Sequence, residues 1–109
     1  MAESLGLMQG TVDVLILKTL AWTPMHGYGI SMWLRDRTNG ELLVEDAALY
    51  QALHRLEKKR LVRSWWGVSE TNRRAKFYEL TTAGRKQLKD QSTELRAYVA
   101  ALFAVLDAK

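Results

Sequence analysis

The segment 45–60 constrains the fold most, because its apolar residues fit one secondary structure only. They recur at the i, i+3, i+4 and i+7 spacing of a helix that packs one face on a core: Leu49, Ala52, Leu53 and Leu56. Acidic residues begin the segment and basic residues end it, which the helix dipole favours. The opposite face carries no carboxylate, and its residues are Ala47, Tyr50, Gln51, His54 and Lys58. We expect this acid-free face to contact a partner.

Positive charge is concentrated between Arg55 and Lys76. The chain of 109 residues has a formal net charge of +4, but this segment holds eight basic residues against two acids and is therefore +6. Such a cluster fits a polyanionic partner, although a solvated basic surface has the same composition.

Composition excludes several classes of protein. A length of 109 residues with 48% hydrophobic content makes one domain with a real core. The chain has no cysteine and two histidines, so we expect no disulfide, no metal and no cofactor. No nucleophile–base group, glycine-rich phosphate loop or carboxylate pair stands out, so catalysis is not expected. A secretion signal and an apolar stretch of roughly 20 residues are also absent, so we expect a cytoplasmic protein with no membrane partner.

Four helices and two strands are predicted along the chain. The periodicity indicates helices over 11–22, 26–38, 45–60 and 83–106, and strands over 61–66 and 76–80. A short extended piece, 42–44, precedes the third helix, and a polar connection of about eight residues joins the strands. The sequence therefore predicts a mainly α (α+β) fold with a two-stranded ribbon that has a basic tip.

Several ring side chains have a structural explanation. His26 precedes Gly27 close to a proline and is interpreted as a helix cap, with a ligand role as the alternative. Tyr28 is expected to be buried with its hydroxyl bonded. The tryptophans are interpreted as core or subunit contacts rather than as ligand-stacking residues: Trp22, Trp33, Trp65 and Trp66.

The last predicted helix carries a heptad-like seam. Leucines seven residues apart alternate with a second row four residues further on, and with a neighbouring phenylalanine they form the predicted dimerisation surface: Leu88, Leu95, Val99, Leu102, Phe103 and Leu106. The seam could pack on its own domain instead. However, a helix of about 24 residues is roughly 35 Å long and outreaches a three-helix core, which favours a homodimer.

Three helices followed by a two-stranded ribbon is the order of a winged helix-turn-helix. In that architecture the third helix enters the major groove of DNA, where Gln51 can contact adenine and Tyr50 and His54 can reach bases or phosphates. The ribbon, or wing, lies along the DNA backbone or in the minor groove, which suits its basic tip. The residues predicted to contact double-stranded DNA are Ala47, Tyr50, Gln51, His54, Lys58, Asn72, Arg73, Arg74 and Lys76.

From Gly10 to about Leu88 the sequence resembles the PadR family of bacterial transcriptional regulators. The resemblance is carried by LILKTLAWTPMHGYGI (15–30), LYQALHRLEKKRLV (49–62) and WGVSETNRRAKFYELTTAGRKQL (66–88), in that order. The resemblance implies a homodimeric repressor. We divide each chain into a DNA-binding domain over 1–82 and a dimerisation helix over 83–109. The resemblance also implies DNA contacts by Tyr50 and the wing sequence NRRAK, and a small aromatic effector near the dimer interface.

Three features depart from the family pattern. The family commonly has serine where this chain has Ala48 and proline where it has Gln51, so the operator preference is expected to differ while docking on DNA survives. The terminal helix has no tryptophan, which some drug-binding members use. Tyr98 and Phe103 are the effector-binding candidates that could replace it.

Two other functions fit the same features. The basic face could bind an acidic protein, or a dimer could bind a ligand without binding DNA. Leu5, Leu7 and Met8 could in addition dock on a partner surface.

Overall fold

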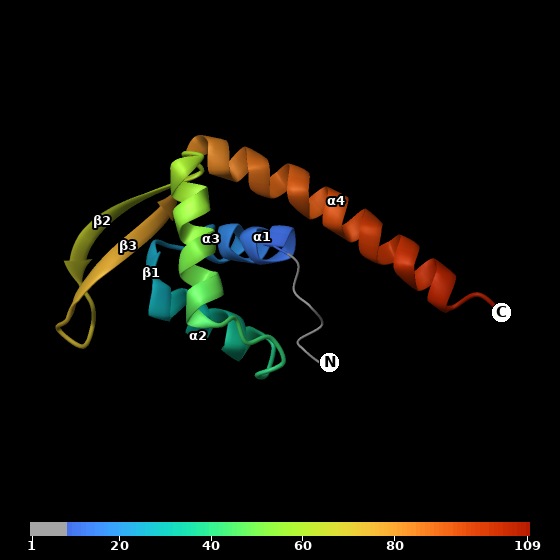
Figure 1. Cartoon of the computed structure of the whole chain (residues 1–109), viewed down its shortest axis with the longest axis horizontal. Coiled ribbons are helices and arrows are strands. Elements are labelled where there is room, and N and C mark those ends of the chain that lie inside the picture. Colours follow the sequence, from blue (N-terminus) through green and yellow to red (C-terminus); the bar gives the residue numbers. More distant parts are fainter. Residues whose placement is uncertain (1–8) are drawn as a thin grey trace.

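The computed structural model describes residues 9–109, which form four helices and a small sheet (Figure 1). The helices are α1 (Gln9–Leu20), α2 (Gly27–Arg37), α3 (Asp46–Lys58) and α4 (Thr82–Leu106), and the strands are β1 (Met25–His26), β2 (Val62–Val68) and β3 (Arg74–Leu80). The predicted mainly α (α+β) fold is confirmed. The predicted docking of Leu5, Leu7 and Met8 lies outside the described residues.

α1 lies at the centre of the domain and packs against α2, α3 and α4. Its sequence is apolar nearly all round, and Ile16 and Leu17 are fully buried. The leucine stripe of α3 packs into the same core, since Leu49, Leu53 and Leu56 are at most 2% exposed. The predicted stripe is therefore confirmed, and its burial decides which face of α3 is left to solvent.

Helix boundaries differ from the predicted ones by up to two residues. α1 begins at Gln9, two residues before the predicted start, so Thr11 lies in its first turn. The piece 42–44, predicted to be extended, belongs to no described strand. Within residues 9–109, no helix combines the length and the apolar character that crossing a bilayer requires.

The backbone fixes the end of α3. Arg60 adopts a left-handed φ of 63°, its N–H donates to the Glu57 carbonyl at 2.9 Å, and the Leu61 N–H donates to the Leu56 carbonyl at 2.9 Å. This pair of bonds is a Schellman motif, which satisfies the last carbonyls of the helix. It ends α3 before Arg60 and turns the chain directly into β2.

The sheet has three antiparallel strands in the order β1-β3-β2. β2 and β3 form the predicted ribbon, and β1 adds a strand at its edge through the pairs Met25↔Tyr78 and His26↔Phe77. The sequence does not predict β1, because two residues are too few to show an alternating pattern. The extra strand joins the start of α2 to the ribbon.

The ribbon is longer than predicted. β2 and β3 remain paired from Val62↔Leu80 to Val68↔Arg74, because backbone hydrogen bonds do not require apolar side chains. Residues 69–73 close the turn, where the Ser69 N–H donates to the Arg73 carbonyl at 2.8 Å. We call β2, β3 and this loop the wing.

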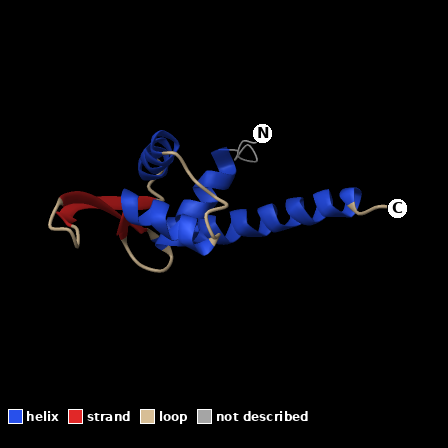
Figure 2. Ribbon diagram, turned by 90° about the horizontal axis from the view of Figure 1, so that it is seen from below, coloured by secondary structure: helices blue, strands red, loops and turns tan. Residues whose placement is uncertain are grey.

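α4 begins where the wing meets the end of α3. Thr81 caps it, since its Oγ1 accepts a hydrogen bond from the Gly84 N–H at 3.0 Å. Gly84 is buried against the Leu61 carbonyl, and a Cβ at this position would overlap that oxygen. α4 then passes α1 and projects from the domain (Figure 2), so that the structure measures 55 × 28 × 21 Å.

Tyr28 is exposed, and the prediction that it is buried is wrong. Its exposed fraction is 68%. α2 buries instead the residues of another side: Gly27, Ile30 and Leu34. Because Tyr28 follows Gly27 by one position, the helical rotation turns it away from the core.

The tryptophans are mostly exposed as well. Trp22, Trp65 and Trp66 are 63%, 40% and 58% exposed, and Trp33 alone among the four packs against the core. Core packing is therefore wrong for three of them, and the subunit contacts that were the alternative stay a prediction for these three. Trp22 follows the end of α1, and the other two are strand neighbours that point to opposite faces of the wing.

Candidate nucleic-acid interface

The outer face of α3 is accessible along its length. Its predicted residues are all exposed: Ala47, Tyr50, Gln51, His54 and Lys58. Arg55, on the neighbouring side of the helix, donates from Nη2 to the mostly buried Asp13 Oδ1 of α1 at 2.8 Å. This ion pair and the leucine stripe hold α3 on α1, so the core sets which side chains of α3 reach solvent.

The far end of the wing presents cations. Asn72, Arg73 and Arg74 are exposed there. The Arg74 guanidinium lies 4.5 Å from the centre of the Trp66 ring, a cation–π contact that orients the charge. Asn72 has a left-handed φ of 61°, which asparagine tolerates better than most residues.

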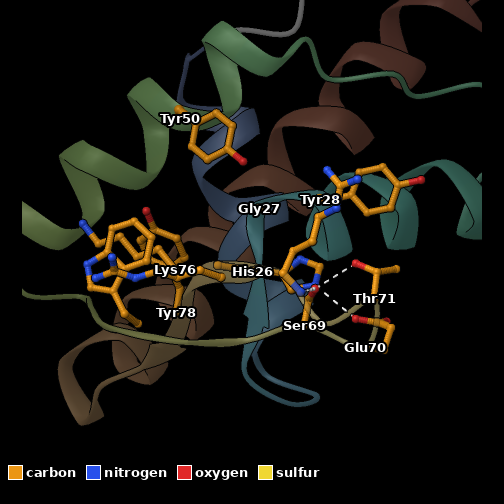
Figure 3. A pocket seen from close by; sticks show the side chains of 13 residues that line it. His26, Gly27, Tyr28, Tyr50, Ser69, Glu70, Thr71, Lys76 and Tyr78 are labelled. Carbon is orange, nitrogen blue, oxygen red and sulfur yellow. Dashed lines mark hydrogen bonds and ion pairs between the residues drawn. The ribbon is translucent and has the colours of Figure 1, made fainter.

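An open cleft of about 770 Å³ lies between α3, the start of α2 and the wing (Figure 3). Four residues predicted to contact DNA line it: Tyr50, Arg73, Arg74 and Lys76. Three others line a more open hollow on the outer face of α3 that also includes Tyr50: Ala47, Gln51 and His54. Lys58 and Asn72 lie outside both hollows. Tyr50 thus joins the face of α3 to the cationic side of the wing.

The cleft contains residues that sequence reasoning did not assign to it. Tyr28 and Trp66 contribute exposed aromatic surface, and Glu70 contributes an acid. Trp66 and Lys76 are cross-strand partners, so they share one face of the wing. Correct pairing of the two strands would have identified Trp66 as a neighbour of the predicted cations.

His26 connects the start of α2 to the wing loop. Its Nδ1 accepts a hydrogen bond from the Gly29 N–H at 3.0 Å, which confirms the interpretation as a cap. Because Nδ1 is the acceptor, Nε2 carries the proton and donates to Glu70 Oε1 at 3.3 Å (Figure 3). The pKa of Glu70 is lowered, first by a backbone hydrogen bond within Glu70 and then by this contact.

Glu57 of α3 holds both strands of the wing. Ser64 Oγ on β2 donates to Glu57 Oε2 at 2.5 Å, and Lys76 Nζ on β3 lies 3.5 Å from Glu57 Oε1. The bond from Ser64 lowers the pKa of Glu57 below its ordinary 4.5; the Lys76 charge acts in the same direction, and partial burial opposes both. Burial also raises the pKa of Tyr78, whose ring centre lies 5.8 Å from the same ammonium group.

The predicted dimerisation residues divide into two groups. Leu88 packs against the core of its own chain, and Leu95 is partly buried. The others are 39% to 75% exposed: Val99, Leu102, Phe103 and Leu106. These four leave an apolar surface on the projecting half of α4.

A smaller cleft of about 360 Å³ lies between α1 and α4. Tyr98 lines it together with Gln91, whose buried Oε1 has no hydrogen-bond partner among residues 9–109. Phe103, the other effector-binding candidate, lies farther along α4 and outside this cleft. Within the described part of the chain, no three histidine, aspartate or glutamate side chains are grouped to hold a metal ion.

One family of transcriptional regulators matches most of the chain. The profile of the transcriptional regulator PadR-like family matches residues 16–90, and its members are regulators rather than enzymes, as expected for this chain. An uncharacterised protein from Lysinibacillus sphaericus is 30% identical over 84 residues, 77% of each chain.

Solved structures agree with this match. A transcriptional regulator from Clostridium thermocellum is 31% identical with a TM-score of 0.80, over 88% of this chain and 93% of that one. A PadR family transcription regulator from Clostridium difficile is 29% identical with a TM-score of 0.74, over 87% of this chain and 97% of that one.

Changing Glu57 to Gln tests the wing attachment. Because the folded pKa of Glu57 is depressed, its carboxylate stabilises the fold above pH 4.5, and this contribution is lost as the pH falls through the lowered pKa. We expect Glu57→Gln to lower the free energy of unfolding at neutral pH by on the order of 1 kcal/mol. The loss is modest because the Glu57 side chain is 35% exposed and solvent screens its charge. At a pH below the lowered pKa, where the carboxyl is protonated, the two proteins should be equally stable.

Urea unfolding followed by circular dichroism measures both values. Glu41→Gln, the same change at an exposed loop carboxylate, is the control and should show no such difference. A stability loss in Glu57→Gln that is equal at both pH values would contradict an electrostatic attachment.

Proposed function

Because the chain belongs to the PadR-like family of transcriptional regulators, we propose that it is a homodimeric repressor of a two-fold symmetric operator. Residues 1–82 form the DNA-binding domain in this proposal, and residues 83–109 the dimerisation helix. One observation carries it: the acid-free face of α3 and the cationic side of the wing meet at Tyr50 on one surface. The protein represses by occupying a promoter, which requires a location in the cytoplasm beside the chromosome.

In the proposal α3 enters the major groove. Gln51 makes paired hydrogen bonds to an adenine edge, and His54 and Tyr50 reach neighbouring bases or phosphates. Ala47, near the start of the helix, is small enough for close approach and can contact a thymine methyl group. Lys58, at the other end, meets the phosphate backbone.

The wing supplies the backbone contacts. Asn72, Arg73 and Arg74 are exposed at its end, where they suit the negative potential of a narrow minor groove or the phosphates beside it. Lys76 lies deeper and is shared with Glu57, so it acts in the cleft rather than at the tip. The Glu57 attachment keeps these cations at a constant distance from α3.

Removing the wing cations tests DNA binding. The variant Arg73→Ala, Arg74→Ala, Lys76→Ala should lose most of its affinity for a duplex of about 30 base pairs that the wild-type protein selects from a random pool. Each lost phosphate contact should reduce the slope of log affinity against log salt by about 1. Fluorescence anisotropy at several salt concentrations measures both quantities.

A matched control removes three cations from α4, with Lys86, Lys89 and Arg96 changed to alanine. The net charge falls equally, but these residues are exposed on a helix that leads away from the wing (Figure 1), so the slope should remain close to that of the wild type. The proposal fails if the wild-type protein selects no duplex, or if both variants lose affinity equally.

Dimerisation rests on the uncovered part of α4. Val99, Leu102, Phe103 and Leu106 lie on the half of the helix that projects from the domain, at spacings that form a coiled-coil seam. Two copies joined there would carry two α3 helices, which predicts operator half-sites about 34 Å apart or a small multiple of this spacing. Leu88 and Leu95 lie nearer the core and would contribute less.

Placing charges on the seam tests the dimer. We expect light scattering to give the wild type twice the 12.5 kDa mass of one chain and the variant Leu102→Lys, Leu106→Lys the mass of one chain. The helical circular dichroism should remain, since both side chains are already exposed. Ala97→Lys, Ala104→Lys on the opposite side of α4 is the control and should remain dimeric; a variant seam that still dimerises would remove this interface.

A small aromatic effector completes the proposal. A phenolic ligand in the smaller cleft could stack on Tyr98 and donate its hydroxyl to the unpaired Gln91 Oε1. An effector releases DNA only if it binds the free protein more tightly than the bound one. Since the cleft lies between α1 and α4, a ligand there could alter the angle at which the dimer holds its two α3 helices.

The effector is tested with 4-hydroxybenzoate as the probe. It should bind by calorimetry and weaken duplex binding, and Gln91→Leu should weaken its binding about threefold to tenfold through the lost hydrogen bond. Gln87→Leu, one turn earlier on α4, is the control and should bind as the wild type does. Equal duplex affinity with and without saturating ligand would exclude this compound as an effector.

A further inference from the structure

Tyr50 rests directly on the backbone at the start of α2. Gly27 is buried, and a Cβ placed on it would overlap the Tyr50 hydroxyl and lie 2.7 Å from the ring Cζ and 2.8 Å from Cε1. Figure 3 shows the Tyr50 ring extending from α3 towards Gly27. The ring therefore occupies the space that any other side chain at position 27 would fill.

Backbone conformation does not explain this glycine. Gly27 lies inside α2, and Gly40 is the one described glycine with a left-handed φ. Glycine is also a poor helix former, so its presence in the first turn needs a reason from packing. The overlap with Tyr50 supplies that reason.

Gly29, one residue beyond Tyr28, provides a comparison within the same turn. A Cβ on Gly29 would come no closer than 3.4 Å to the His26 ring, which is ordinary van der Waals contact. Of the two glycines that open α2, only Gly27 makes room for a residue of the candidate interface.

We infer, on the basis of the proposed function, that Gly27 is a positioning residue for DNA recognition. Tyr50 is 49% exposed, so solvent on its outer side would not by itself restrict rotation of the side chain. Contact with Gly27 restricts that rotation and directs the ring across the cleft between α3 and the wing. A side chain held in place before binding loses less conformational freedom when DNA arrives, which increases affinity.

The inference predicts a specific dependence between two positions. With a methyl group at position 27 the Tyr50 ring must leave its present position, because its hydroxyl and ring atoms would overlap the new Cβ. Gly27→Ala should therefore impair DNA binding only while the tyrosine is present. In a protein that already lacks the ring, the same methyl group has nothing to displace.

A double-mutant cycle measures this dependence. The probe is a duplex that the wild-type protein selects from a random pool, and affinity is measured by fluorescence anisotropy. Gly27→Ala should weaken binding about tenfold, the loss expected for one well-placed base contact. In the Tyr50→Ala background, Gly27→Ala should cause no further loss. Gly29→Ala, the matched glycine change, should bind as the wild type does.

A second measurement needs no DNA. In the wild-type protein the Tyr50 ring current should displace the Gly27 Hα resonances from their ordinary values, and Tyr50→Ala should return them to those values while the Gly29 resonances stay nearly constant. If Gly27→Ala alone does not fold, the double variant should, because removing the ring leaves space for the methyl group. A double variant that is also unfolded would overturn the packing argument.

The outcomes separate this inference from the proposed function. Wild-type affinity in Gly27→Ala, or equal losses with and without the tyrosine, overturns the positioning role while DNA binding stands. A wild-type protein that selects no duplex overturns both, and the Hα resonances then report the packing alone.

Discussion

The packing of α3 on α1 is the interaction on which the rest of the structure depends. Burial of Leu53 and its neighbours fixes the rotation of α3 about its axis, and the pair Arg55–Asp13 adds a directional contact at the same interface. Half a turn of α3 about its own axis would exchange its buried and exposed faces. The leucines that stabilise the core therefore also determine which side chains of α3 are exposed. The wing is attached to this helix in turn, through Glu57.

Most of the fold could be predicted from local patterns. The leucine stripe, the cap at His26 and the alternation in the wing each involve residues a few positions apart, where periodicity determines structure. β1 could not be predicted, because its two residues are defined by β3, some fifty residues away. The orientation of Tyr28 failed for a related reason: the rotation of α2 follows from how Gly27 and Ile30 meet the core, not from their own spacing.

The cations and the α3 face of the candidate site could be predicted from the sequence, but the contacts that position them could not. Composition identified the cations of the wing and the acid-free face of α3, and the structure brings Tyr50, Arg73, Arg74 and Lys76 to one cleft. The interactions that position them were missed, because they join distant segments. The two acids of the basic segment make such interactions. Glu57 of α3 accepts a hydrogen bond from Ser64 of the wing, and Glu70 in the wing loop contacts His26. Isolated acids within a basic region were the available signal.

The junction at Leu61 has a mechanical consequence. Its carbonyl accepts a hydrogen bond from the Thr81 N–H at 3.1 Å and lies against Gly84, while the Thr81 hydroxyl donates to the neighbouring Arg60 carbonyl at 2.8 Å. α3, the wing and α4 therefore converge on two adjacent carbonyl groups. α4 can therefore be treated as a rod that pivots at this junction. At 1.5 Å per residue it is about 37 Å long, and a tilt of about 5° at the junction displaces its far end by about 3 Å. A small change of angle at the junction therefore becomes a larger displacement at the far end of α4.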